Sequence, residues 1–303
     1  MLPRALLLAL VALAADAAAP RPDAGSPAKG EARPQQISTA HFEVQFTVPT
    51  PVGKGYAALC ERAYSRFCDL FDVPSGEAVW EGKCRVFLFA TREQFVSFAA
   101  ATAGPGTALS GGFASPTKKN PTIVMPMYGQ DRVHLEQVLI HEMSHVFLQL
   151  YRKEVQLPTW LHEGCAQFFE FLHQPGDSRL TQWRPLVKAL VSAGRERPLR
   201  EFWVAAFPPV DRVGYAQAWS LIHCLSQHPR TRGKIGRFVL KLKELAPERP
   251  GFVHIQSEAD LRRVFQEAAD RAFQLQSDAF EQVFGMPVAD FERVWKQFVL
   301  ATY

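Results

Sequence analysis

The stretch HLEQVLIHEMSHVFL, residues His134–Leu148, places two histidines four positions apart with a glutamate directly after the first. On an α-helix, His141 and His145 lie on one face, about 6 Å apart along the axis. Their imidazoles can therefore bind a single metal ion. Glu142 points about 100° round the helix from His141, so its carboxylate can accept a proton from a water molecule that the metal polarises. The pattern predicts a metal centre with Glu142 as general base.

Two simpler interpretations of these histidines are weaker. The chain has nine histidines in 303 residues, and a chance His-Glu-x-x-His match is expected roughly 0.02 times. A solvated helix face is disfavoured because most flanking residues are apolar, namely Val138, Leu139, Ile140, Met143, Val146, Phe147 and Leu148. Partly buried His and Glu side chains need a metal ion or a dense hydrogen-bond network. Metal binding is the prediction, and a hydrogen-bonded core cluster is the alternative.

A third ligand is expected in LPTWLHEGCA, residues Leu157–Ala166. Catalytic zinc takes three protein ligands and leaves one position for water. The Pro-Thr pair is typical of a helix start, and 17 residues separate His145 from Glu163, enough for a second helix to return antiparallel to the first. His162 is the rival ligand, but it points about 100° away from Glu163. We expect one zinc ion per chain, bound by His141, His145 and Glu163.

Both motifs resemble those of the gluzincin branch of zinc metallopeptidases, and within it the proteins with a peptidase-MA-like domain. The matching segments are His-Glu-x-x-His at 141–145 and Trp-Leu-x-Glu-Gly-x-Ala at 160–166. The likeness runs from about His41 to the closing helix that contains Trp295. It implies a zincin-like fold with the active site between a small sheet and a helical half, and a peptide or protein substrate. It also implies that the Gly-rich segment before the first motif supplies an edge strand lining the cleft.

The same resemblance draws attention to Tyr215. Aminopeptidase-like gluzincins carry a tyrosine on a later helix whose hydroxyl stabilises the oxyanion, and Tyr215 opens a comparable helix. A packing tyrosine is the alternative. Thermolysin-like members also place a histidine-orienting carboxylate four residues after the glutamate ligand, whereas this chain has Gln167 there. Glu170 is the candidate for that orienting role. The motif by which aminopeptidases capture a substrate N-terminus is not found, so an endopeptidase is favoured.

Apolar patterns predict a sheet before the first motif. Polar and apolar residues alternate from His41 to Val48, as in a half-buried strand, and Arg85–Ala90 is a continuous apolar run typical of an interior strand. The expected elements are strands at 41–48, 85–90, 112–114 and 122–125 and helices at 53–71 and 91–101. Helical periodicity dominates after Asp131. The predicted fold class is α+β, with a small twisted N-terminal sheet and helices followed by a mainly helical C-terminal part.

The first 36 residues are expected to lie outside the folded domain. Arg4, an apolar stretch of Ala and Leu, and the small-x-small pattern at 15–17 are typical of a secretory signal peptide, assigned to residues 1–17. Residues 18–36 are rich in proline and are expected to form a flexible linker. The metallopeptidase domain is expected at 37–303, with a sheet-containing half at 37–150 and a helical half at 151–303. The protein is predicted to be secreted or periplasmic.

The charge of the chain does not favour a nucleic-acid partner. Lys and Arg number 34 against 30 Asp and Glu, which leaves a net charge of only +4. Basic residues between Arg230 and Lys243 alternate with apolar ones at helical spacing, so a solvated helix face is expected there. No membrane span is expected after removal of the signal peptide. The sequence makes no prediction about the oligomeric state.

The five cysteines allow at most two disulfide bonds. Cys60 and Cys68 are about 12 Å apart along one helix, which is too far for a bridge between them. Cys68 with Cys84 is the expected bridge. Cys165 with Cys224 is a second candidate, with two buried thiols as the alternative.

The hypothesis that follows is a secreted or periplasmic zinc-dependent endopeptidase. A non-catalytic binding or scaffold domain that keeps the zincin fold is the alternative, and a maturation protease confined to one partner is a third. Glu142 favours the enzyme, because a scaffold has no need of a base beside the metal.

Overall fold

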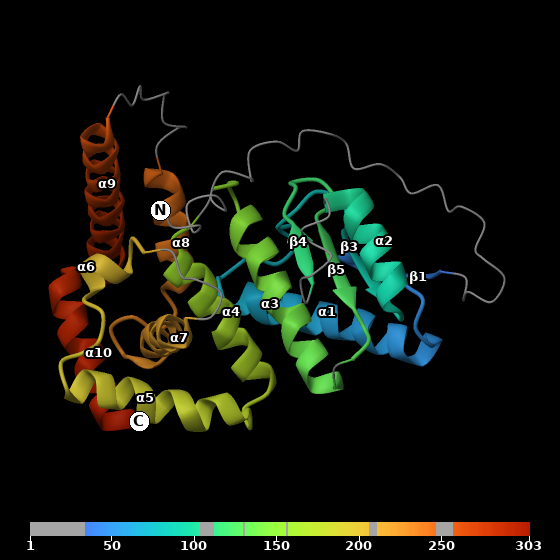
Figure 1. The fold of residues 1–303 in the computed structure, drawn as a ribbon, viewed down its shortest axis with the longest axis horizontal. Coiled ribbons are helices and arrows are strands. Elements are labelled where there is room, and N and C mark those ends of the chain that lie inside the picture. The colour runs from blue at the N-terminus through green and yellow to red at the C-terminus, as the bar shows by residue number, and fades with distance from the viewer. Residues whose placement is uncertain (1–33, 104–111, 130, 156, 206–210, 247–256) are drawn as a thin grey trace.

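The computed structural model describes residues 34–103, 112–129, 131–155, 157–205, 211–246 and 257–303. The predicted signal peptide and nearly all of the predicted linker lie outside these ranges. Within them the chain is α+β, with a five-stranded mixed sheet on the N-terminal side and a mainly helical C-terminal part (Figure 1). The predicted fold class is confirmed at this level.

The sheet has the strand order β1-β2-β3-β5-β4. Its strands are β1 (Gln35–Ser38), β2 (Phe42–Phe46), β3 (Cys84–Phe89), β4 (Phe113–Ser115) and β5 (Thr122–Pro126). The inner strands β2, β3 and β5 are parallel, whereas β1 and β4 pair antiparallel at the two edges. The continuous apolar run therefore forms the central strand β3, as predicted. Phe113–Ser115, within the Gly-rich segment that precedes the first motif, form the edge strand β4.

Strand β1 was not predicted from the sequence. Gln35 and Gln36, which the sequence assigns to the flexible linker, pair with Phe46 and Gln45 of β2. Gln35 and Gln36 therefore belong to the sheet, although the domain was expected to start at Ile37. An edge strand that is largely exposed on both faces has no alternating apolar pattern, so the sequence carries no strand signal there.

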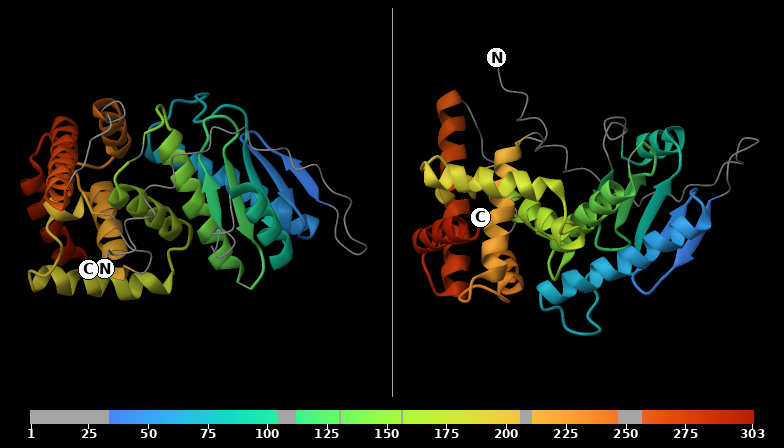
Figure 2. Two further views of the ribbon diagram at one scale, coloured as in Figure 1. Left: turned by 45° about the horizontal axis from the view of Figure 1, so that its top comes forward. Right: turned by 90° about the horizontal axis from the view of Figure 1, so that it is seen from below.

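Alternate residues of the strands enter two hydrophobic cores on opposite faces of the sheet. Val86 and Leu88 of β3 face the large core with helix α1 (Thr50–Leu70), whereas Phe87 faces a smaller core with α2 (Arg92–Ala103). Figure 2 shows α1 and α2 on the two sides of the sheet. Thr91 caps α2 as predicted, because its Oγ1 accepts a hydrogen bond from the backbone N–H of Gln94.

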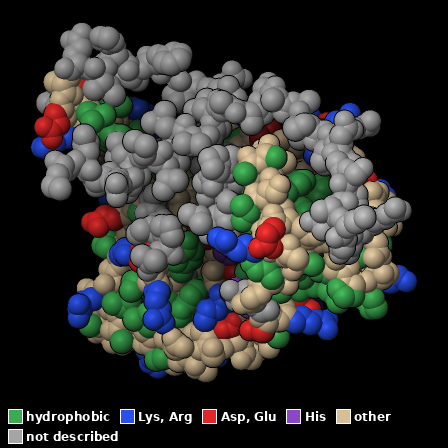
Figure 3. Space-filling view, turned by 45° about the vertical axis from the view of Figure 1, so that its right-hand side comes forward, with side chains coloured by type: hydrophobic (Ala, Val, Ile, Leu, Met, Phe, Trp, Pro, Cys, Tyr) green, Lys and Arg blue, Asp and Glu red, His purple; other side chains and the backbone are tan. Residues whose placement is uncertain are grey.

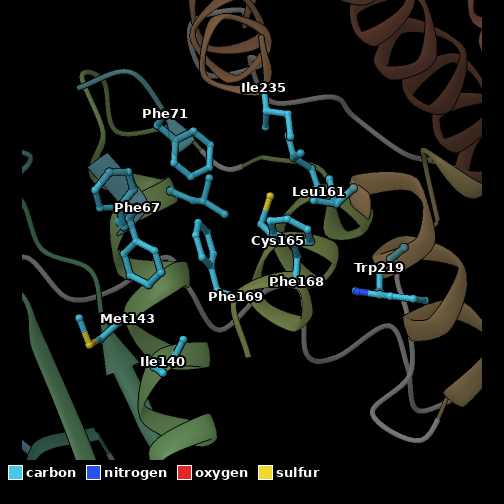
Figure 4. Close-up of a cluster of buried hydrophobic side chains, with 14 of the residues drawn as sticks. Phe67, Phe71, Ile140, Met143, Leu161, Cys165, Phe168, Phe169, Trp219 and Ile235 are labelled. Atoms are coloured by element: carbon cyan, nitrogen blue, oxygen red, sulfur yellow. The ribbon is translucent and has the colours of Figure 1, made fainter. Parts of the chain in front are cut away.

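The large core continues from the sheet into the helical part. The remaining helices are α3 (Arg132–Leu150), α4 (Thr159–His173), α5 (Ser178–Ser192), α6 (Leu199–Phe202), α7 (Arg212–Gln227), α8 (Ile235–Leu245), α9 (Glu258–Phe284) and α10 (Val288–Thr302). Figure 4 shows Phe169 of α4 directed at Phe67 of α1 and at Phe71, which follows α1 directly. The ring centroid of Phe169 lies 4.3 Å from that of Phe67 and 6.2 Å from that of Phe71. These aromatic contacts join α4 to the sheet-containing half.

Lys243 does not lie on a solvated helix face, contrary to the sequence-based expectation. It is buried, and its Nζ donates hydrogen bonds of 2.8–2.9 Å to the carbonyls of Gln149, Tyr151 and Lys153. Carbonyls at the C-terminal end of a helix have no partner within the helix, so a lysine ammonium is favourable there. Lys243 therefore holds α8 against the end of α3.

All five cysteines lie in the described ranges and are free thiols, so the predicted bridge Cys68–Cys84 is wrong. Cys165 and Cys224 are two buried thiols, which was the alternative to a bridge between them. Burial raises the pKa of the Cys84 thiol, and the nearby Cys60 raises it further. Cys68 lies two turns further along α1 and interacts with Tyr64. The helix therefore presents Cys60, and not Cys68, to the start of β3.

Within the described ranges, no helix is both long enough and apolar enough to cross a membrane. On the face drawn in Figure 3, the described side chains intermix positive, negative and hydrophobic groups.

Candidate metal centre

Helix α3 brings His141 and His145 together on one face. Asp131 fixes the start of this helix, because its side chain accepts a 2.9 Å hydrogen bond from the backbone N–H of His134. One turn separates the two imidazoles, whose Nε2 atoms are 3.0 Å apart with the rings nearly perpendicular. Both side chains are about one-fifth exposed, so the site is open to solvent on one side.

Helix α4 runs antiparallel to α3, as the sequence predicts. Three cross-helix pairs show the direction, since rising residue numbers on α3 meet falling ones on α4: Glu136 with His173, His141 with Glu170, and His145 with Glu163. Oε2 of Glu163 lies 3.5 Å from Nε2 of His141, and Oε1 lies 3.7 Å from Nε2 of His145. The three predicted ligand residues thus come together. One donor atom from each residue lies within 4.8 Å of the donor atoms of the other two.

The outer nitrogen of each histidine has its own partner on α4. Nδ1 of His141 donates to Oε1 of Glu170 at 2.6 Å, so the orienting carboxylate expected at Glu170 contacts this ring. Nδ1 of His145 lies 3.2 Å from Nδ1 of His162. His162, the rival ligand, therefore contacts the back of His145. Both rings are held with Nε2 turned toward Glu163.

The donor set fits a zinc ion. Oε2 of Glu163 is buried and has no hydrogen-bond partner, and a buried carboxylate oxygen without one is costly. When both Nδ1 atoms carry protons, the two Nε2 lone pairs face each other and need a cation between them. Zinc bonds of about 2.0–2.2 Å at tetrahedral angles put neighbouring ligand atoms roughly 3.3–3.5 Å apart. The two Nε2 atoms are 3.0 Å apart, Oε2 of Glu163 lies 3.5 Å from one and Oε1 lies 3.7 Å from the other, and one donor atom from each residue lies within 4.8 Å of the other two.

The protonation states of the metal-free cluster are strongly coupled. Burial alone lowers the pKa of His141, but the hydrogen bond and charge of Glu170 outweigh it and raise this pKa to about 9. Burial and the nearby His141 hold the pKa of His145 well below its usual value. Burial also raises the pKa of Glu163, which His141 partly offsets. His141 therefore carries a proton at neutral pH, and its Nε2–H donates to the neutral His145 across 3.0 Å, a contact that a bound metal ion would replace.

Glu142 lies beside the cluster and outside the group of converging donor atoms. Burial raises the pKa of its carboxyl; His141 opposes this shift and Glu170 adds to it. A carboxylate with a raised pKa is a better proton acceptor near neutral pH. This position and environment suit a general base.

Tyr215 lies in the first turn of α7, which packs along α4. Its pKa is raised to about 12 by burial first and then by the charges of Glu163 and Asp211. Tyr215 is therefore close enough to Glu163 for their charges to interact. It also packs against the large core, which keeps a packing role open for the same side chain.

Two residues near the cluster were not predicted from the sequence. Arg179 pairs with Glu170 at 2.6 Å, and Asp177 caps α5 and pairs with Arg179 at 2.7 Å. A Pro-Gly-Asp turn before a helix is the signal that marks Asp177 as a cap. Nothing in the sequence indicates that Arg179 reaches α4. His134 is exposed and is not among the converging donors.

No protein-family model matches this chain, and a search among curated proteins finds no match.

Proposed function

We propose that the protein is a zinc-dependent peptidase, with one zinc ion held by His141, His145 and Glu163. The observation that carries the proposal is the convergence of these three side chains, in which a buried oxygen of Glu163 accepts no hydrogen bond from any described residue. Two histidines and one carboxylate are a ligand set of catalytic zinc sites that keep a position for water. When bound, zinc supplies Lewis acidity, which polarises a peptide carbonyl and makes water more acidic.

Glu142 accepts the proton of the attacking water and passes it to the leaving amine. Its raised pKa makes both transfers accessible near neutral pH, since the group can take up and release a proton. Tyr215 donates a hydrogen bond from its hydroxyl to the oxyanion. A phenol with a pKa near 12 stays protonated at neutral pH and so remains a donor.

The substrate is a peptide or protein segment that binds in extended form. Strand β4 is a sheet edge and contacts α3, the helix that carries both histidines. An open strand edge offers backbone N–H and C=O groups for pairing with an added strand. This arrangement, with two antiparallel helices beside a sheet, supports the zincin-like fold and gluzincin relationship suggested by the sequence motifs. We favour an endopeptidase that is secreted or periplasmic. The localisation rests on the sequence of residues 1–17 alone.

Metal analysis combined with peptide cleavage tests this proposal. The purified protein should contain about one zinc per chain and should cleave members of an unbiased peptide mixture, with cleavage stopped by a chelator and restored by zinc. Zinc binding without any cleavage would support the alternative of a zincin-fold scaffold domain. Absence of zinc binding would reject the proposal.

A further inference from the structure

A chain of hydrogen-bonded side chains lies behind His141. Gln137 donates to Asp177, whose Oδ2 pairs with Arg179 at 2.7 Å. Arg179 pairs with Oε2 of Glu170 at 2.6 Å, and Oε1 of Glu170 accepts from His141 at 2.6 Å. Gln137 and His141 are one turn apart on α3, so this chain of contacts begins and ends on the same helix. It joins α3, α4 and the start of α5.

The guanidinium of Arg179 is held from several directions. It pairs with both carboxylate oxygens of Asp177, donates to Oε1 of Gln167 at 3.2 Å, and lies over the rings of Phe171 and Trp183 at 4.8 and 5.9 Å. A planar guanidinium with this many contacts is rigid. Its position does not depend on Glu170 alone.

The carboxylate of Glu170, in contrast, depends on two partners. Its side chain is 5% exposed, and it uses one oxygen for His141 and the other for Arg179. A buried carboxylate without its cationic partner is costly and tends to rearrange. If Glu170 moves, the imidazole of His141 loses the contact that fixes its ring plane.

We infer that Arg179 is a positioning residue of the metal centre, which acts through Glu170 to aim Nε2 of His141 at the ion. The inference rests on the proposed zinc site, and adds a residue that is separated from the metal by Glu170 and His141. Outer partners of metal-ligating histidines typically change metal affinity or activity by 10–100-fold.

The chain offers a matched control in Arg197. This arginine pairs with Asp211, the N-cap of α7, through two nitrogens, just as Arg179 pairs with Asp177, the N-cap of α5. The exposures also match, at 40% for Arg197 and 34% for Arg179, with 8% for each aspartate. Among the described residues, Arg197 forms hydrogen bonds with Asp211 and Gln217, neither of which is a predicted zinc ligand. Its loss therefore reproduces the structural damage without the contact to Glu170.

The test measures zinc dissociation constants by chelator competition, and Co²⁺ absorption spectra, for wild type, Arg179→Gln, Arg197→Gln, Glu170→Gln and the Arg179→Gln/Glu170→Gln double variant. Arg179→Gln should weaken zinc binding about 10-fold and alter the Co²⁺ spectrum. Arg197→Gln should change neither. The double variant should bind zinc as Glu170→Gln does, because Arg179 acts through Glu170. Arg179→Lys keeps the positive charge but not the planar guanidinium, so it should weaken zinc binding less than Arg179→Gln does. It replaces Arg179→Gln in the test if that variant does not fold.

The possible failures are distinguishable. If wild type binds no zinc, the proposed function fails and this inference with it. If wild type binds zinc and both Arg179 variants bind it equally tightly, only the inference fails. Equal weakening by Arg197→Gln, or additive losses in the double variant, would show a general structural effect and overturn the positioning role.

Discussion

Gly164 of α4 packs against Ala218 of α7 so closely that a Cβ atom on the glycine would lie 2.7 Å from the Ala218 carbonyl oxygen. The same atom would lie 2.8 Å from Cγ1 of Ile222. Real Cβ atoms do not approach backbone that closely without a shift of the chain. The glycine directly after Glu163 is therefore what lets α7, with Tyr215 in its first turn, lie against the ligand-bearing helix.

Gly164→Ala should destabilise the protein by about 1–3 kcal/mol, because α4 and α7 must move apart. Urea unfolding measures the change. Gly55→Ala is the control, since Gly55 is an exposed helix residue whose Cβ would contact nothing within 4 Å. That change should stabilise α1 by roughly 0.5–1 kcal/mol. Equal stability of wild type and Gly164→Ala would contradict the tight crossing.

Glu142→Gln and Glu163→Gln should separate the base from the ligand. Glu142→Gln keeps the donor set and should bind zinc as wild type does, while peptide hydrolysis falls by about 10²–10⁴-fold. Glu163→Gln removes a charged ligand, so zinc affinity and activity should fall together, with partial recovery in excess zinc. Metal content after dialysis and initial cleavage rates are the measurements. Wild-type rates in Glu142→Gln would rule out the mechanism.

Tyr215→Phe tests the oxyanion donor. The ring and its packing remain, so zinc content and unfolding free energy should change little, whereas kcat should fall by about 10²–10³-fold with little change in KM. An unchanged kcat would instead assign Tyr215 to packing.

The thiols should be free and mostly unreactive in the folded protein. Cys60, Cys84, Cys165 and Cys224 are fully buried, and only Cys68 is partly exposed. Burial also raises the pKa of all five thiols, which slows reaction with a thiol reagent. Titration should count at most one thiol in native protein and five after denaturation without reductant. Fewer than five in the denatured protein would reveal a disulfide.

Lowering the pH should remove the contribution that ionised Asp211 makes to the free energy of unfolding. Burial alone raises the pKa of Asp211, but its bonds from Arg197 and the Gly214 N–H outweigh this and lower it below the usual value. Its contribution is therefore complete above about pH 4, the range of an aspartate in the unfolded chain, and is lost as the pH falls through the folded value. Asp211→Asn keeps a helix cap but not the charge. The gap in unfolding free energy between wild type and this variant should shrink below about pH 4 in urea titrations, and a constant gap would contradict the linkage.

The sequence by itself determined the local features of this protein. Helical periodicity sets His141 and His145 one turn apart, because any α-helix brings residues i and i+4 to one face. The apolar run of β3 fixes an interior strand, and Thr91 fixes the start of α2. Each depends only on residues within a few positions along the chain.

The tertiary structure decided which residues from distant segments of the chain contact one another. It selected Glu163 over His162 for the side chain that faces both Nε2 atoms, because the rotation of α4 is set by Gly164 against α7 and by Phe169 against α1. It left Cys68 and Cys84 unbridged, buried Lys243 at the end of α3, and brought Arg179 to Glu170. No short-range pattern encodes such contacts, since each depends on how whole helices pack around the shared core.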